Sequence, residues 1–303
     1  MMKNNFNIHN PSIQSYHETK THTGLMFPYN VYLCTIPDDF PSVFLHWQDT
    51  MEIIYIKKGT GLAQVDLSVF EVHGGDIILA PPGRLHGLEH IPGMHMEYEN
   101  IIFDLAFLGS DPIDLCSQNY LIPLKQNRMS LPQCITSCHV HYDSIAACLN
   151  DADMLCDEKP AGYELGVKAD MLRLFSLIIR FMDTEAKINE SSHPLDIDRL
   201  KTVLQFIEDH YQHPISVEAA AHTCSYSPSH FMRWFRRMTG TSFIKYLNRF
   251  RLNKALEELK NTDRTILEIS QRSGFDNLSN FNRLFKKQFH KTPRELRSPG
   301  QQY

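Results

Sequence analysis

Two similar stretches decide the fold of the C-terminal third: SYSPSHFMRWFRRMTG from Ser225 to Gly240, and GFDNLSNFNRLFKKQFHKTP from Gly274 to Pro293. Each has an aromatic residue in a turn, followed by the pattern F-x-R-x-F and two basic residues. The pattern begins at Phe231 in the first copy and at Phe281 in the second. Self-similarity of this kind indicates a structural unit that occurs twice.

A short helix is predicted in front of each copy. Ser216 caps the segment VEAAAHT, and Thr265 forms a T-x-x-E capping box with Glu268 before the segment ILEISQR. A short helix, a tight turn and a second helix make a helix-turn-helix unit. The segment from Ser242 to Lys260 predicts a long helix that holds the two units at a fixed separation.

The second helix of each unit has an apolar and a polar face at about 100° per residue. The apolar faces are predicted core: Phe231, Trp234, Phe235 and Met238 in the first unit, and Phe281, Leu284, Phe285 and Phe289 in the second. A polar face on one helix is ordinarily only solvated, but two matching faces favour DNA contact, because Arg and Asn read base edges and Lys neutralises phosphate. The predicted DNA-binding residues are Ser229, His230, Arg233, Arg237, Ser279, Asn280, Arg283, Lys286 and Lys287.

The charge distribution supports this interpretation. The chain of 303 residues has a net charge of −5, which by itself argues against nucleic acid. Residues 196–303, however, carry 18 Lys/Arg against 11 Asp/Glu, and the remaining residues carry 12 against 24. An acidic front and a basic back indicate two modules with different partners.

Residues 196–297 resemble the DNA-binding domain of the AraC/XylS family of bacterial transcription regulators. The resemblance is carried by the two units joined by a helix, by Gly274–Phe275, by the F-x-R-x-F-K-K pattern ending at Lys287, and by T-P-R-E-L from Thr292. It implies recognition of an asymmetric site by two helices, with a second subunit on a repeated half-site. The sequence departs from the family at His290, where Gly is usual after the second unit's helix.

The front half predicts an α+β organisation. Short β-rich runs over residues 30–110, separated by Gly/Pro turns, predict a β-barrel of about residues 25–132. Residues 141–157 and 163–182 read as helices, and the polar segment 186–195 reads as a linker. We therefore expect a cupin-like effector-binding and dimerisation domain over 1–185 and an all-α double helix-turn-helix domain over 196–303.

Two spaced motifs in the barrel region resemble those of cupins: Glu52 with Gly59, and Gly75 with P-x-G at Pro81 and then His86. In enzymatic cupins two His, one Glu and a final His bind a divalent metal. His46 and Glu52 align with the first His and the Glu, and His86 aligns with the last His. Gln48 stands at the second His and His90 at the usual closing Asn, so we expect a former metal site that holds no metal or other cofactor.

The same side chains predict a small-molecule pocket, because carboxylate and imidazole groups beside aromatic faces suit a polyhydroxylated ligand. The predicted effector-binding residues are His46, Trp47, Glu52, Tyr55 and His86. A retained divalent metal and a barrel lip without any ligand are the alternatives. The nearby C-x3-C-H-x-H at Cys134–His141 matches no standard zinc spacing and is interpreted as coincidence.

The helix predicted over 163–182 carries a broad apolar stripe. Either it covers the barrel or it pairs with a second subunit. We predict that it forms the dimer interface through Leu165, Leu172, Phe175 and Ile179.

Together these features predict a homodimeric transcription regulator of the cytoplasm, and not an enzyme. Its expected partners are promoter DNA, a small-molecule effector of the sugar class and, for an activator, RNA polymerase; no membrane segment is expected. One alternative is an effector-independent regulator whose front domain only dimerises. The other is a metal-dependent cupin enzyme fused to a DNA-binding domain.

Overall fold

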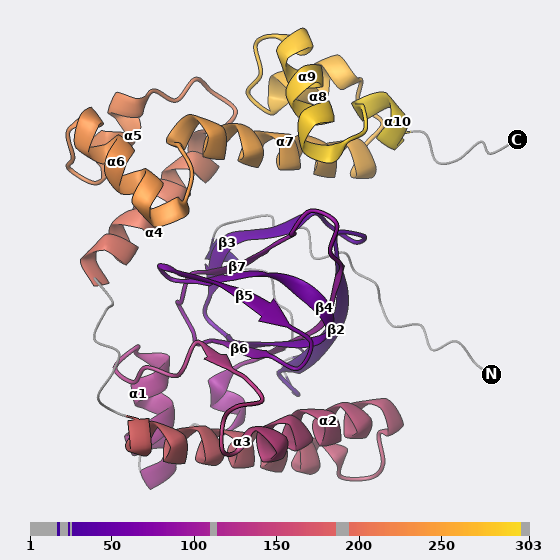
Figure 1. The fold of residues 1–303 in the computed structure, drawn as a ribbon, viewed down its shortest axis with the longest axis vertical. Coiled ribbons are helices and arrows are strands. Elements are labelled where there is room, and N and C mark those ends of the chain that lie inside the picture. Colours follow the sequence, from indigo (N-terminus) through magenta and orange to yellow (C-terminus); the bar gives the residue numbers. More distant parts are fainter. Residues whose placement is uncertain (1–16, 19–23, 25, 110–113, 186–193, 298–303) are drawn as a thin grey trace, which may run out of the picture. The chain divides into compact units, whose positions relative to one another are not determined.

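A computed structural model describes residues 17–18, 24, 26–109, 114–185 and 194–297, and Figure 1 draws the fold. The chain divides into two compact units, Met1–Ser192 and His193–Tyr303. Most of the predicted linker, residues 186–193, lies outside the described residues. Its last two residues are not linker, because Pro194 and Leu195 begin helix α4. Proline is favoured in the first turn of a helix, where a missing N–H leaves no hydrogen bond unmade.

The first unit is rich in β-structure, as expected. Its described strands form one nine-stranded sheet that curls around an interior (Figure 1). The pairing is antiparallel except between β1 and β3, which run parallel. The strands are β1 His17–Glu18, β2 Tyr29–Ile36, β3 Ser42–Gln48, β4 Met51–Val65, β5 Ser68–His73, β6 Ile77–Ala80, β7 His86–Glu89, β8 Met96–Phe103 and β9 Cys134–Ile135.

The long strand β4 connects two parts of the sheet. Its first half pairs with β6 and β8, and its second half pairs with β5 and β7. The strand turns at Gly59, whose φ is +83°. A Cβ there would lie 1.8 Å from the carbonyl oxygen of His95, so only glycine fits. Gly75 and Gly83 of the cupin-like motifs also have positive φ.

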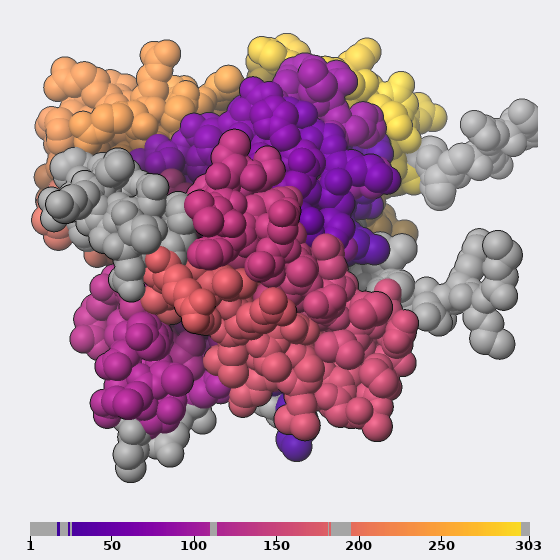
Figure 2. Space-filling view, turned by 60° about the horizontal axis from the view of Figure 1, so that its bottom comes forward, coloured from indigo at the N-terminus to yellow at the C-terminus, as the bar shows by residue number. Residues whose placement is uncertain are grey.

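Alternate residues of the strands enter two different cores, because successive side chains of a strand point to opposite faces. Ile54 and Ile56 of β4 face the interior and pack in an apolar inner core with Tyr98. Met51, Ile53 and Tyr55 face outward into a second core shared with the helices. Figure 2 turns this helix-covered side of the unit toward the viewer.

Two long helices, α2 Tyr142–Glu158 and α3 Tyr163–Glu185, pack against each other and cover the outer face of the sheet. Short helical segments precede them: η1 Leu105–Phe107, η2 Ser117–Leu121 and α1 Ile122–Lys125. The two long helices agree with the predicted ones to within a few residues.

The second unit is helical throughout its described residues, which confirms the α+β class with an all-α back half. Each helix-turn-helix unit begins with a capped short helix, as the sequence predicts: Ser216 accepts from Ala219, and Thr265 and Glu268 form a capping box. The helices are α4 Pro194–His210, α5 Val217–Thr223, α6 Pro228–Thr239, α7 Phe243–Asn261, α8 Ile266–Arg272, α9 Leu278–Phe289 and α10 Pro293–Arg297.

Helix α7 is shared by both helix-turn-helix units. Near its start, Phe243 and Tyr246 pack on Phe235 of α6 with edge-to-face ring contacts. Its later residues, Leu252 to Leu259, pack with Phe281 and Phe285 of α9 in a separate core. Among the residues described, every helix is too short or too polar to serve as a membrane span.

Candidate nucleic-acid interface and candidate effector site

Helices α6 and α9 present polar faces to solvent. Phe231 and Phe281 are fully buried at equivalent positions, whereas Arg233 and Arg283 two residues later are exposed. Leu284 and Phe289 of the predicted core are only partly buried. All predicted DNA-binding residues are exposed: Ser229, His230, Arg233 and Arg237 on α6, and Ser279, Asn280, Arg283, Lys286 and Lys287 on α9.

Asp196 at the start of α4 holds α6 in place in the first helix-turn-helix unit. Its Oδ1 accepts from the indole Nε1 of Trp234 at 3.0 Å and from the hydroxyl of Tyr226 at 3.3 Å. Its Oδ2 accepts from Arg237 at 3.2 Å, although the Arg237 side chain remains 69% exposed. Arg237, one of the predicted DNA-binding residues, thus also has an intramolecular partner.

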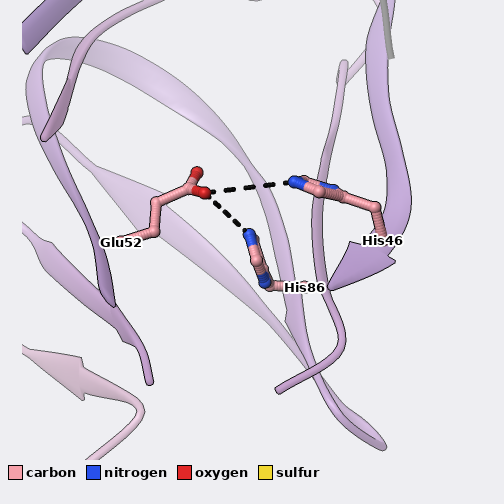
Figure 3. Close-up of side chains that lie close together, drawn as sticks. All are labelled: His46, Glu52 and His86. Atoms are coloured by element: carbon pink, nitrogen blue, oxygen red, sulfur yellow. Dashed lines mark hydrogen bonds and ion pairs between the residues drawn. The ribbon is translucent and has the colours of Figure 1, made fainter. Parts of the chain in front are cut away.

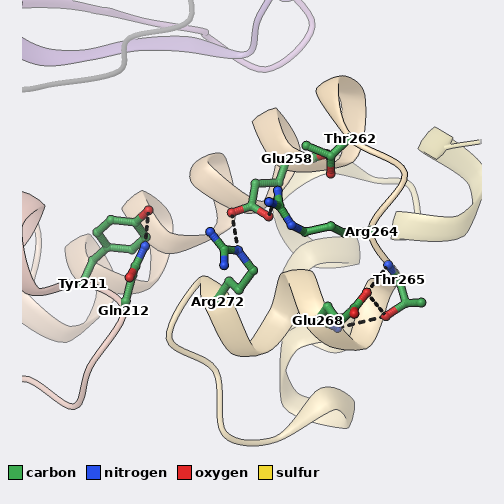
Figure 4. Close-up of polar contacts among 8 residues, drawn as sticks. All are labelled: Tyr211, Gln212, Glu258, Thr262, Arg264, Thr265, Glu268 and Arg272. Carbon is green, nitrogen blue, oxygen red and sulfur yellow. Dashed lines mark hydrogen bonds and ion pairs between the residues drawn. The ribbon is translucent and has the colours of Figure 1, made fainter.

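In the second helix-turn-helix unit, α7 holds the neighbouring helix in place instead. The carboxylate of Glu258 pairs with Arg264 at 3.5 Å and with Arg272 at 3.3 Å, which attaches α8 and the residues before it to α7 (Figure 4). Within α9, the amide oxygen of Asn280 accepts from Arg283 at 2.8 Å, so two predicted base-reading side chains hold each other in position.

Arg251, near the middle of α7, connects the two helix-turn-helix units. Its Nε donates to the carbonyl of Tyr211 at 2.8 Å and its Nη2 to that of His213 at 2.7 Å, both after α4. Gly274, at the turn of the second unit, lies against the same guanidinium. Burial lowers the pKa of Arg251, and the charge of Asp276 partly opposes this. The sequence contained no local signal for these roles of Arg251 and Asp196, because the groups that they bind are 30–41 residues away.

Inside the first unit, His46, Glu52 and His86 converge (Figure 3). His46 and His86 stand opposite each other on β3 and β7, with ring centroids 4.2 Å apart. Oε2 of Glu52 lies 3.0 Å from Nε2 of His86 and 3.9 Å from Nε2 of His46. All three side chains are buried. We call these three residues the barrel triad.

The pKa values of the two imidazoles differ although both rings are buried. Burial lowers the pKa of His46, and the neighbouring His86 lowers it further. Burial also acts to lower the pKa of His86, but the charge of Glu52 and its hydrogen bond to the ring outweigh this and raise it. The pKa values of the two rings are therefore shifted in opposite directions.

Two predicted pocket residues do not join the triad. Tyr55 is on the opposite face of β4 from Glu52 and is buried in the outer core, where Lys57 lies 4.2 Å over its ring. Trp47 is only partly buried and stacks on His17 at 5.6 Å. The structure does not bring them together with the triad because side chains alternate along a strand, so neighbours of His46 and Glu52 in sequence need not share their face. Their part in effector binding stays a prediction.

Two other side chains do reach the triad. Gln48 donates from Nε2 to Oε2 of Glu52 at 2.7 Å. Glu18 of β1 brings its Oε2 to 3.5 Å from Nε2 of His46, and its side chain is 8% exposed. The sequence contained no local signal for Glu18, since it enters only through the pairing of β1 with β3.

The barrel triad is also the only group of three or more potential metal-ligating side chains that the described residues bring together. Two imidazoles and a carboxylate are a ligand set that zinc and other divalent transition metals accept. The C-x3-C-H-x-H stretch does not form such a group: Cys138 is exposed, and Nδ1 of His139 accepts from the amide of Thr136.

The predicted dimer stripe on α3 faces two ways. Phe175 is buried in the outer core, 6.3 Å from the ring of Phe103, and Ile179 packs partly against the same core. Phe175 therefore covers the sheet and is not exposed to a partner, which corrects the prediction for this residue, whereas Ile179 is only partly buried. The dimer interface itself stays a prediction. Leu165 and Leu172 are 74% and 38% exposed.

Comparison with protein families identifies this architecture. Residues 30–175 match the AraC-like ligand binding domain, and residues 220–298 match a helix-turn-helix domain. The chain belongs to the AraC family of transcription regulators. As a member of the AraC family, it is a DNA-binding regulator with a ligand-binding domain.

The alignments with two related regulators span nearly the whole length of both chains. The uncharacterized HTH-type transcriptional regulator YdeC of Bacillus subtilis strain 168 is 25% identical over 92% of this chain and 95% of its own. The HTH-type transcriptional activator RhaS of Escherichia coli O6:H1 strain CFT073 is 25% identical over 86% of this chain and 88% of its own. A solved AraC-type regulator from Chromobacterium violaceum is 29% identical over 34% of this chain and 96% of its own, with a TM-score of 0.32.

Proposed function

We propose that this AraC-family regulator is a homodimeric transcription activator that reads promoter DNA with α6 and α9 and responds to a small-molecule effector bound in its first unit. The observation that carries the proposal is the pair of matching polar faces, with Arg233 and Arg283 exposed at equivalent positions of a basic unit. Activation is supported by the name of the relative RhaS, a transcriptional activator. RNA polymerase is then a partner, and the cytoplasm, which holds the chromosome, is the place of action.

Binding of the full chain to genomic DNA fragments tests the first part. If Lys and Arg of α6 and α9 displace counterions, affinity falls by roughly two to three orders of magnitude between about 50 and 200 mM salt. Arg233→Ala and Arg283→Ala each lose roughly 1–3 kcal/mol at one base position of the selected site. Lys286→Ala weakens binding to all sequences alike, because phosphate contacts carry no sequence information. Unchanged sequence preference in both Arg variants contradicts the assignment of the two faces.

We propose that the effector binds at the barrel triad, with sugars as the first class to test. Carboxylate, imidazole and amide groups offer the hydrogen-bond partners that hydroxyl groups need. A thermal-shift screen measures this directly, since a ligand that binds only the native state raises its melting temperature. Glu52→Gln is expected to abolish that shift while leaving DNA affinity intact, because α6 and α9 belong to the other compact unit. A front domain that only dimerises shows no shift with any compound.

We propose that two copies pair through the exposed side of α3. Leu165 and Leu172 are seven residues apart and therefore share one face of the helix. Replacing both by Glu places charge in the interface and is expected to give a folded monomer. Leu33→Glu, at another strongly exposed leucine, is the matched control and leaves the dimer unchanged. Sedimentation of the double variant as a dimer places the interface elsewhere.

A further inference from the structure

The exposed residues of helices α6 and α9 correspond one to one. Each exposed residue of α6 has an exposed counterpart 50 positions later in α9. Most pairs keep their chemistry, because serine matches serine and a basic side chain matches a basic one. Two pairs differ in kind, His230 with Asn280 and Met232 with Asn282. The other pairs are Ser229 with Ser279, Arg233 with Arg283, Arg236 with Lys286, and Arg237 with Lys287.

The first of the two differing pairs is engaged within the protein. The ring of His230 packs edge-to-face on that of Tyr226, with centroids 4.2 Å apart. The amide oxygen of Asn280 accepts from Arg283 at 2.8 Å. The clearest chemical difference between the two exposed faces is therefore the thioether of Met232 against the amide of Asn282.

Met232 stands out on α6 by its exposure. Its side chain is 50% exposed, whereas the other large apolar residues of the helix are buried. A single exposed apolar residue is ordinary on a protein surface, so exposure alone indicates no function. Its position does: Met232 lies three residues after Ser229 and four before Arg236, so the three share one side of the helix. An apolar side chain thus lies within the face that is proposed to read DNA.

The major groove offers a methyl group at only one of the four bases. Thymine presents its C5-methyl group there, and apolar side chains contact it. A thioether carries no N–H or O–H donor, but it is flexible and polarisable and can follow the shape of such a group. An asparagine amide instead forms two hydrogen bonds with N6 and N7 of adenine. Equivalent positions of α6 and α9 therefore suit two different bases.

We propose that Met232 recognises the C5-methyl group of a thymine and that Asn282 recognises an adenine at the equivalent position of the α9 contact. Both helices then require an A·T base pair, α6 through the methyl group and α9 through adenine N6 and N7. The two helices share their basic side chains and differ in the atoms that they read. This inference rests on the proposed role of α6 and α9 in DNA reading and deepens it by naming the bases.

Exchange of thymine for uracil in the DNA tests the role of Met232. The full chain selects a site from random-sequence duplexes, and each thymine is then replaced in turn by deoxyuridine, which lacks only the methyl group. We expect affinity to fall about fourfold at one position, as for the loss of one buried methyl group. Met232→Ala is expected to bind the thymine duplex correspondingly weaker and to show no further loss with uracil there, because the two changes remove the same contact. Met232→Leu keeps an apolar side chain and retains the discrimination.

Exchange of adenine for 7-deazaadenine tests Asn282 in the same duplex. It removes the N7 acceptor and with it one of the two hydrogen bonds, so we expect a loss of about fivefold at one adenine. Asn282→Ala is expected to lose this discrimination and to keep that between thymine and uracil. Ile244→Ala is the matched control: Ile244 is 49% exposed but belongs to α7, so both discriminations stay as in the wild type.

Three results overturn the proposal. A selected site at which no exchange of thymine for uracil weakens binding leaves Met232 without its methyl group. A uracil effect that persists in Met232→Ala assigns the methyl contact to another side chain. A 7-deazaadenine effect that persists in Asn282→Ala does the same for the adenine. In each case the wild type still prefers its selected site, whereas a wild type without any sequence preference contradicts the proposed function as well.

Discussion

The two helix-turn-helix units share one pattern but are supported differently. In the first unit a single carboxylate, Asp196, accepts from side chains of α6 and from the turn before it. In the second unit α7 supplies the support, through Glu258 and through the contact between Arg251 and Gly274. The recognition helices also end differently, at Gly240 in the first unit and at His290 in the second, both in the left-handed region. Repetition of a motif therefore does not repeat the interactions that hold it.

The largest expected effect on stability is at the turn of the second helix-turn-helix unit. In Gly274→Ala the new Cβ would lie 2.2 Å from the carbonyl oxygen of Tyr211 and 2.7 Å from Nε of Arg251, at a φ of +83°. Because backbone and a buried guanidinium must move, we expect a loss of about 3 kcal/mol or more. Gly240→Ala, at a φ of +71° with open space around it, is the control and costs about 1 kcal/mol. Denaturant unfolding measures both, and equal losses contradict the role of Arg251 as a joint.

The next largest effect is expected to destabilise only the first helix-turn-helix unit. Asp196→Ala leaves the buried indole N–H of Trp234 without its acceptor, which we expect to cost about 2 kcal/mol. Asp196→Asn keeps an acceptor oxygen and is expected to lose less. Hydrogen exchange should accelerate in α6 and remain slow in α9. Faster exchange in both helices would show that the two units unfold together.

A smaller effect of opposite sign is expected at the end of α9. His290 adopts a φ of 56° although it carries a Cβ. His290→Gly removes that strain and makes the second unit match the first, with an expected gain of about 0.5–1 kcal/mol. The melting temperature of the second unit reports the gain. A loss of stability would mean that the imidazole makes a contribution larger than the backbone strain.

The smallest effect concerns pH. Hydrogen bonds from the side chain and backbone of Thr265 lower the pKa of Glu268, whereas α5 of the first unit has Ala219 at the equivalent position. A lowered folded pKa contributes stability above the unfolded value of about 4.3, and this is lost as pH falls through the folded value. Acid should therefore loosen α8 before α5 in exchange measurements. Glu268→Gln should remove this difference between the two helices.

Much of the second compact unit, which contains both helix-turn-helix units, was predictable because its sequence signals are local. Capping residues at Ser216 and Thr265, the helical spacing of Phe231 and Phe281, and Pro228 in a first turn all lie within a few residues of what they determine. The supports at Asp196 and Arg251 were not predictable, since each joins helices far apart in the chain.

The sequence by itself determined a double helix-turn-helix unit behind a β-rich unit, and it identified His46, Glu52 and His86 as neighbours in a site. The tertiary structure alone decided what surrounds them. Strand register brought Glu18 beside Gln48, and alternation along β4 sent Tyr55 to the opposite face from Glu52. Packing likewise divided the stripe of α3, with Phe175 buried and Leu165 exposed. The faces of a helix follow from residues close together in sequence, whereas strand pairing depends on segments distant in sequence.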